Sequence, residues 1–172
     1  MATAATKVAQ AAPMFSVRPT RLDQLLAAAA GMLAVVIVAA IARGRSEWGE
    51  VPTLVWAHIG TILLAVSLTP TMLLRRRGDM LHRRLGWIWV LALTATALLS
   101  FFIRGLNQGS FSLIHILSIW TLIQLPLIVW HARNHRHNKH RAAVRGMVIG
   151  ALLIAGFFTF PFERLMGHWL VG

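Results

Sequence analysis

The sequence contains no cysteine and only five acidic residues among its 172 positions. Without thiols the chain cannot form a disulfide, an iron–sulfur cluster, a thiolate metal site or a cysteine nucleophile. The scarcity of Asp and Glu argues against a carboxylate-rich metal cage and a glycosidase carboxyl pair. Charged residues make up 13% of the chain and hydrophobic residues 57%, whereas soluble domains carry about 25% and 45–50%. This composition predicts a membrane-embedded protein.

The hydrophobic residues gather in long runs without the alternation of β-barrel strands. A helix of about 20 apolar residues crosses the hydrocarbon core of a bilayer, and lipid-exposed backbone must satisfy its own hydrogen bonds. We therefore predict an all-α integral membrane protein with one transmembrane domain over residues 22–172 and a disordered cytoplasmic arm over residues 1–21. Its five transmembrane helices are expected at residues 22–42, 51–74, 85–103, 111–130 and 142–162.

The basic residues indicate how these spans are oriented. Thirteen of the 17 Lys and Arg residues lie in residues 1–21 and in the links 75–84 and 131–145. Five alternating spans put these three segments on one side of the membrane. Because cytoplasmic loops are enriched in Lys and Arg, we expect a cytoplasmic N-terminus and a periplasmic C-terminus. The net charge of +12 then reflects loops facing anionic lipid, and no nucleic-acid partner is expected.

Four histidines are the candidate functional residues, because ionisable side chains within membrane spans are rare. At 1.5 Å per residue, His58 lies roughly 10 Å into the second span, and His115 lies roughly 6 Å into the fourth. Both spans run inward, so the two side chains share the outer part of the bilayer. His82 opens the third span and His140 opens the fifth on the inner side. The sequence thus offers one histidine pair in each leaflet.

Two imidazoles from facing helices are the axial ligands of a six-coordinate b-type haem. The pattern predicts two haem b groups, with iron ligated by His58 and His115 and by His82 and His140. Two stacked haems would carry electrons across the membrane. Small residues near the ligands would give the flat ring room, namely Gly60, Gly86 and Gly146. Arginines at the inner rim would pair with the propionates, namely Arg83, Arg84 and Arg141.

Other interpretations stay open beside this one. A lone histidine in a span often forms a hydrogen bond across a helix interface, and His131 lies near the same boundary as His140. A haem-free protein would serve as an accessory or scaffold subunit of a larger membrane complex. A transporter is less favoured because we find no polar midplane site and no internal repeat. A metal ion in the inner histidine cluster would face repulsion from neighbouring cations, and that cluster comprises His131, His135, His137 and His140.

The segment His82–Ile88, His-Arg-Arg-Leu-Gly-Trp-Ile, resembles an element of the small bacterial membrane family called domain of unknown function 2306. The resemblance covers about residues 54–167, and its further elements follow in order at residues 100–103, 112–119, 140–147 and 155–164. The family has no established activity. The histidine arrangement resembles that of the cytochrome b-561 and ferric-reductase group, in which a four-helix core holds two haems.

These resemblances imply several further expectations. Spans two to five would form a four-helix bundle with the first span at its periphery, in a bacterial inner membrane. The protein would be an oxidoreductase-like electron carrier, supplied by a quinol or a small reductant and coupled to a partner membrane or periplasmic redox protein. The family-like context around His140 favours it over His131 as the inner ligand.

Overall fold

The computed structural model describes residues 18–76, 78–103, 113–161 and 164–172, and no strand occurs among them. The long helices are α1 (Arg21–Arg43), α2 (Thr53–Leu74), α3 (Met80–Ser100), α4 (Leu113–Arg133) and α5 (His137–Met147). Helix α5 continues through the π-helical segment η2 (Val148–Ile154) into α6 (Ala155–Phe157). Two short helices complete the chain, η1 (Gly44–Glu50) and α7 (Leu165–Val171).

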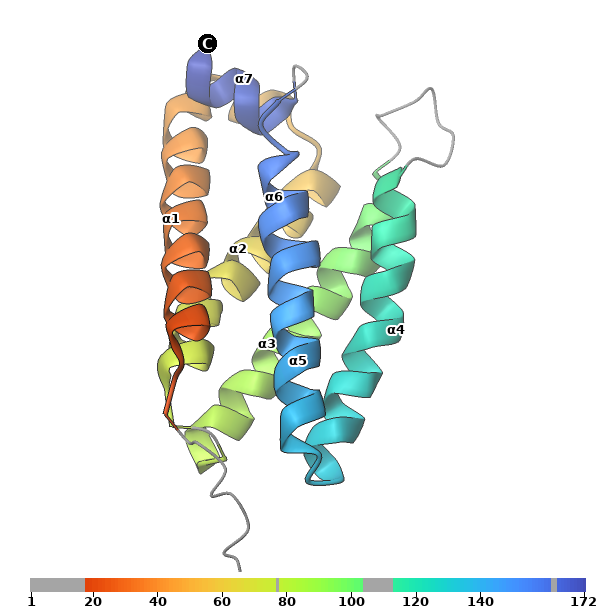
Figure 1. Cartoon of the computed structure of the whole chain (residues 1–172). Helices are drawn as coiled ribbons and strands as arrows, with labels where there is room; N and C mark the ends of the chain where they lie inside the picture. Colours follow the sequence, from red (N-terminus) through yellow and green to blue (C-terminus); the bar gives the residue numbers. More distant parts are fainter. Residues whose placement is uncertain (1–17, 77, 104–112, 162–163) are drawn as a thin grey trace, which may run out of the picture.

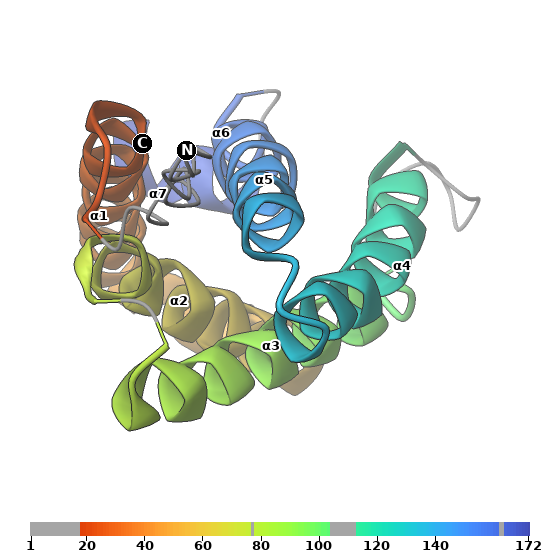
Figure 2. The same ribbon diagram turned by 60° about the horizontal axis from the view of Figure 1, so that its bottom comes forward.

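Successive long helices run in opposite directions (Figure 1). Each packs against the next in the chain, and η2 returns to α1, so the helices form a closed ring when viewed from one end (Figure 2). The ring has two distinct ends. The basic end holds the start of α1, the α2–α3 link and the α4–α5 link, and the α7 end holds η1 and α7 (Figure 1).

Four helical stretches are long and apolar enough to cross a membrane: Arg21–Glu50, Thr53–Leu74, His115–Arg133 and His137–Phe157. Helix α3 is not among them although it has 21 residues, because its first two turns carry His82, Arg83 and Arg84. The prediction of an all-helical chain with several membrane-length spans is confirmed. The predicted arm at residues 1–21 falls mostly outside the described residues, as do the predicted boundaries at residues 111 and 162.

One apolar core runs through the ring and receives side chains from every long helix. Its largest buried members include Trp89 and Leu93 of α3 and Leu125 of α4, and α1 contributes Leu26 and Ala27. Helix α1 shares this core and packs along α2, and the four-helix bundle of spans two to five with the first span at its periphery stays a prediction. An added Cβ on Gly31 of α1 would lie 3.8 Å from Pro70 of α2, an ordinary van der Waals contact.

At the basic end, Asp79 begins α3 as its N-terminal cap. Its Oδ1 accepts a hydrogen bond from the His82 backbone N–H at 2.7 Å, which satisfies one of the free donors of the first turn. The Arg75 guanidinium Nη2 lies 2.8 Å from Asp79 Oδ2. The hydrogen bond from Arg75, followed by that from the His82 N–H, lowers the pKa of Asp79 below its usual range.

At the α7 end, the indole of Trp169 covers Gly44, which joins α1 to η1. A Cβ on Gly44 would lie 2.1 Å from a carbon of the indole, so only glycine fits beneath this ring. The Trp169 Nε1–H donates to Glu47 Oε2 at 3.0 Å. Trp56 contacts both Trp48 and Trp169, with ring centroids 5.5 and 5.9 Å apart. These contacts hold α7 across the end of α1.

Candidate functional site

His58 lies in the second turn of α2 and faces α3. Its Nδ1 is 3.2 Å from the backbone oxygen of Thr96, and the ring is half-buried. Because a carbonyl oxygen only accepts hydrogen bonds, Nδ1 carries the proton in this contact. The Nε2 atom therefore keeps a free lone pair, which is the tautomer of a metal-ligating histidine with its other nitrogen held by a carbonyl.

His115 begins the described part of α4 on the other side of the α3 end. Its side chain is buried, with 6% exposed, and its ring centroid lies 5.8 Å from that of Phe101, which directly follows α3. One turn further along α4, the hydroxyl of Ser118 contacts that of Ser100 on α3. His115 is thus packed against the last turn of α3 by an apolar ring and a neighbouring hydroxyl pair.

Between these two histidines lies a group of hydroxyl side chains that the sequence argument missed. Thr96 Oγ1 is 2.9 Å from Thr61 Oγ1, and Thr61 Oγ1 in turn lies 3.0 Å from the His58 backbone oxygen. We call Thr61, Thr96, Ser100 and Ser118 the hydroxyl cluster. Thr96 and Ser100 are spaced four residues apart in an apolar helix, so one face of α3 carries both. That spacing was the signal available in the sequence.

The structure therefore brings the predicted outer pair to one region of the α7 end. His58 touches α3 at Thr96, and His115 touches the chain at Phe101. Helices α2 and α4, which carry the two imidazoles, each pack along α3. The two ring contacts fall in the last two turns of α3 and at the residue directly after it.

His140 lies in the first turn of α5 and faces α4. Its Nδ1 is 3.0 Å from the backbone oxygen of Ile128, so Nδ1 again donates. The two predicted ligands His58 and His140, at opposite ends of the ring, thus share one hydrogen-bonding arrangement. In both cases the carbonyl belongs to a neighbouring helix, which fixes the ring orientation by tertiary structure.

His82 lies at the same basic end as His140 but on a different side of it. It belongs to the first turn of α3, next to the Asp79 cap. In the end view, that turn lies beside the end of α2, whereas the start of α5 lies beside the end of α4 (Figure 2). The structure places both predicted inner ligands at one end and does not pack their helix starts against each other.

His131 occupies the last turn of α4 at this end. Its Nδ1 is buried and has no hydrogen-bond partner within the described part of the chain. Its backbone oxygen accepts from the Arg136 N–H at 2.9 Å, closing the link to α5. The exposed rings of His135 and His137 lie 6.0 Å apart. Among the described residues, no group of three or more His, Asp or Glu side chains could hold a metal ion.

Arg141 was expected to pair with a haem propionate, but it contacts Asp23 of α1 instead. Its Nη2 lies 2.6 Å from Asp23 Oδ2, and Arg145 reaches Asp23 Oδ1 at 2.8 Å. The Asp23 side chain is fully buried. Thr20 completes the group, since its hydroxyl accepts from Arg141 at 3.0 Å and from Arg145 at 2.6 Å. We call these four residues the basic-end ion-pair cluster.

The glycines near the predicted ligands differ in the space around them. A Cβ on Gly60 or Gly146 would meet nothing within 4 Å. Two residues along a helix correspond to a turn of about 200°, so Gly60 lies on the face opposite His58. Four residues correspond to about 400°, which puts Gly86 on the same face as His82, where its Cβ would lie 3.5 Å from Met72 Cε. Only the Gly86 position follows the expectation of a glycine beside its histidine.

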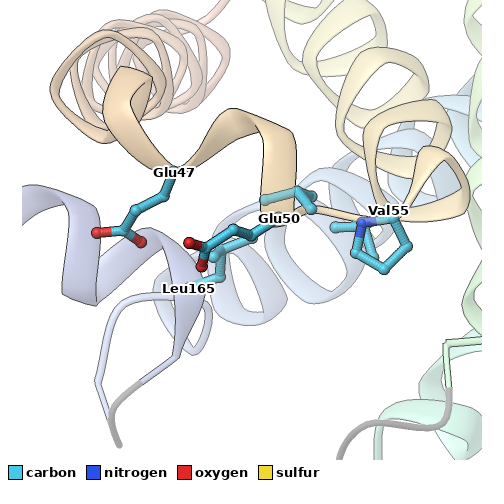
Figure 3. A pocket seen from close by; sticks show the side chains of 6 residues that line it. Glu47, Glu50, Val55 and Leu165 are labelled. Carbon is cyan, nitrogen blue, oxygen red and sulfur yellow. The ribbon is translucent and has the colours of Figure 1, made fainter.

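A shallow pocket of about 210 Å³ opens at the α7 end, where η1 meets α2 and α7 (Figure 3). The carboxylates of Glu47 and Glu50 extend toward it, as Figure 3 shows. Glu47 is also held by Trp169, and its Oε1 lies 3.3 Å from His168 Nε2. The remaining lining residues are apolar: Val51, Pro52, Val55 and Leu165. None of the four predicted ligands lines this pocket.

Comparisons with known protein families, with curated proteins and with solved structures return no match.

Proposed function

We propose that the protein transfers electrons across a membrane as a b-type cytochrome with two haem groups. His58 and His115 would hold one haem near the α7 end, and His82 and His140 the other near the basic end. The observation that supports the proposal is the shared arrangement of His58 and His140. In each, Nδ1 donates to a backbone carbonyl of another helix, which is the contact that commonly orients a metal-ligating imidazole.

The chain's own residues give these ligands a defined environment. The carbonyls of Thr96 and Ile128 orient the two rings and would make each Nε2 a more basic ligand for iron. The burial of His115 against Phe101 would exclude water from the α7-end site, and exclusion of water is one determinant of a haem potential. When bound, haem supplies reversible one-electron chemistry between ferric and ferrous iron.

We propose five membrane spans, with α3 as the third, in a bacterial inner membrane. The basic end would face the cytoplasm and the α7 end the periplasm. The support is the location of the predicted basic links at one end of the ring (Figure 1), since cytoplasmic loops retain Lys and Arg. A quinol or a small reductant would donate electrons at one face, and a membrane or periplasmic redox protein would accept them at the other.

The topology is testable by single-cysteine labelling, because the chain has no native cysteine. Asn138→Cys lies in the basic end and Gly49→Cys in the α7 end, and both positions are exposed. In intact cells, a membrane-impermeant maleimide is expected to label Gly49→Cys and to spare Asn138→Cys until the membrane is opened. If the reagent labelled only Asn138→Cys from outside, the basic end would face the periplasm and the proposed orientation would be wrong.

The haem proposal is tested by purifying the protein from haem-replete cells and recording the reduced-minus-oxidised spectrum and the haem content. We expect two haems per chain. His58→Ala and His140→Ala should each lose one. His135→Asn is the matched control, because His135 is exposed and has the positive φ of 53° that asparagine tolerates. A wild-type protein without haem absorption would end the proposal.

A second candidate function follows from the apolar core. All five long helices meet through one continuous cluster of buried hydrophobic side chains, which favours a haem-free accessory or scaffold subunit of a larger membrane complex. On that interpretation the histidines only tie helices together. The wild type and His58→Ala would then both lack haem absorption, and His58→Ala would only reduce stability or assembly. The same measurement therefore separates the two functions.

A further inference from the structure

The first turns of α5 are held in place by polar contacts on two sides. Met147 is the one fully buried residue of the helix, and Ala143 and Val144 pack partly buried against the core. On one side, Arg141 and Arg145 reach Asp23 of α1. On the other side, His140 Nδ1 donates to the carbonyl of Ile128 on α4. The start of α5 is therefore fixed between α1 and α4 by directional bonds.

Asp23 is the residue on which the α1 side of this arrangement depends. Its carboxylate is fully buried, and each of its oxygens accepts from a different arginine. Thr20 and Asp23 also form a reciprocal cap on the first turn of α1, which fixes the Asp23 rotamer. A buried carboxylate cannot be left unpaired without a large penalty. The contact is consequently rigid, because any rotation of α5 that separates the groups would leave the buried carboxylate unpaired.

His140 directly precedes Arg141, and Arg145 follows one turn later. Arg141 and Arg145, four residues apart, share one face of α5, while His140 points about 100° away from that face. A rotation of α5 about its axis would break the contacts with Asp23 and would also move the imidazole from the Ile128 carbonyl. The position of His140 Nε2 is thus coupled to the Asp23 carboxylate through the backbone of one turn.

We infer that Asp23 is a positioning residue for His140, acting from α1 through Arg141 and Arg145. The inference rests on the proposed function for the ligand role of His140. It assigns Asp23 no contact with haem. It predicts that neutralising Asp23 changes the ligand geometry at the basic end and leaves the His58 site at the α7 end unchanged, which a general loss of stability would not do.

The experiment compares Asp23→Asn with Glu50→Gln, the same change from carboxylate to amide at an exposed position of the other end. Arg145→Gln is the milder variant, because it leaves the Arg141–Asp23 pair in place. The first measurement needs no haem. Spin labels are attached to Leu25→Cys on α1 and Ala142→Cys on α5, both exposed positions in a chain without native cysteine, and the label-to-label distance is measured by pulsed electron resonance.

We expect a narrow distance distribution in the wild-type and Glu50→Gln backgrounds. Asp23→Asn should broaden it and shift it to longer distances, and Arg145→Gln should give a smaller change in the same direction. An Asp23→Asn distribution identical to that of the wild type would overturn the inference, because α5 would then keep its orientation without the carboxylate.

The second measurement is the low-temperature electron resonance spectrum of the oxidised, haem-loaded protein. The signal that His140→Ala abolishes should shift in Asp23→Asn, whereas the signal that His58→Ala abolishes should stay unchanged. Equal shifts of both signals would contradict the inference. A wild-type protein that contains no haem would contradict the proposed function and the ligand role of His140. The distance measurement would then still decide whether Asp23 orients α5.

Discussion

The hydroxyl oxygens of Ser100 and Ser118 lie 2.6 Å apart and join the last residue of α3 to the second turn of α4. Both side chains are buried. Ser100 Oγ also lies 2.7 Å from the Ala97 carbonyl oxygen, and either hydroxyl of the pair can donate the shared hydrogen bond. The pair links α3 and α4 within the hydroxyl cluster.

Replacing Ser118 should destabilise the α3–α4 interface. Ser118→Ala removes the contact with the Ser100 hydroxyl, so we expect a loss of about 1 kcal/mol in the free energy of unfolding, the usual size for hydrogen bonds between membrane helices. Unfolding in mixed detergent micelles measures it. Ser67→Ala, at an exposed position of α2, is the control. If Ser100→Ala and Ser118→Ala prove fully additive in the double variant, the two hydroxyls are not coupled.

The indole of Trp89 should be sensitive to loss of its N–H. Trp89 Nε1 donates to Thr69 Oγ1 at 3.0 Å, and both side chains are buried between α3 and α2. Trp89→Phe removes the donor and leaves space, so we expect a destabilisation of about 1–3 kcal/mol. Trp87→Phe makes the same change at a side chain that is 52% exposed. Equal melting temperatures for the two variants would contradict the role of the buried hydrogen bond.

A methyl group on Gly44 should displace α7. The added Cβ would lie 2.1 Å from Trp169, so Gly44→Ala must push the indole away and weaken its bond to Glu47. We expect faster tryptic cleavage after Arg164 in the variant. Gly49→Ala is a matched control in the same short helix, because a Cβ there meets nothing within 4 Å. Identical cleavage rates in the two variants would show that α7 is not held by this contact.

The carboxyl group of Asp79 should titrate at lower pH than an ordinary aspartate. The hydrogen bond from Arg75 lowers its pKa in the folded protein, so its stabilising contribution is present above the usual value of about 3.9 and is lost as the pH falls through the lower folded value. Asp23 and Asp79 are the only aspartates, so carboxyl carbon NMR of labelled protein can follow the Asp79 signal with only one other aspartate signal beside it. Arg75→Gln should move that of Asp79 upward, and an unchanged midpoint would contradict the assignment.

Hydropathy located the helices well where their ends lie in apolar sequence. The span predicted at residues 22–42 corresponds to Arg21–Arg43, and the span at 51–74 to Thr53–Leu74. The fifth helix begins at His137 rather than at residue 142, because its first turn is polar and carries no hydropathy signal. Helix α3 similarly begins at Met80, five residues before the predicted start, where the Asp79 cap determines its first turn.

The tertiary partners of single polar residues were beyond the reach of local sequence. The buried Asp23 is paired with Arg141, which lies 118 residues away along the chain. The place of α1 within the ring depends on the same contacts. The sequence did predict that His58 and His115 lie together at one end of the ring of helices, and His82 and His140 at the other. It held no information on which carbonyl each ring would meet, since Thr96 and Ile128 offer only main-chain atoms.

The pairing of Asp23 with Arg141 and Arg145 also imposes an order on biogenesis. These arginines are synthesised 118 and 122 residues after the carboxylate, so Asp23 gains them as partners only after α1 to α4 have been made. The pairing is complete only when α5 is in place, and the same step brings the last long helix back to the first.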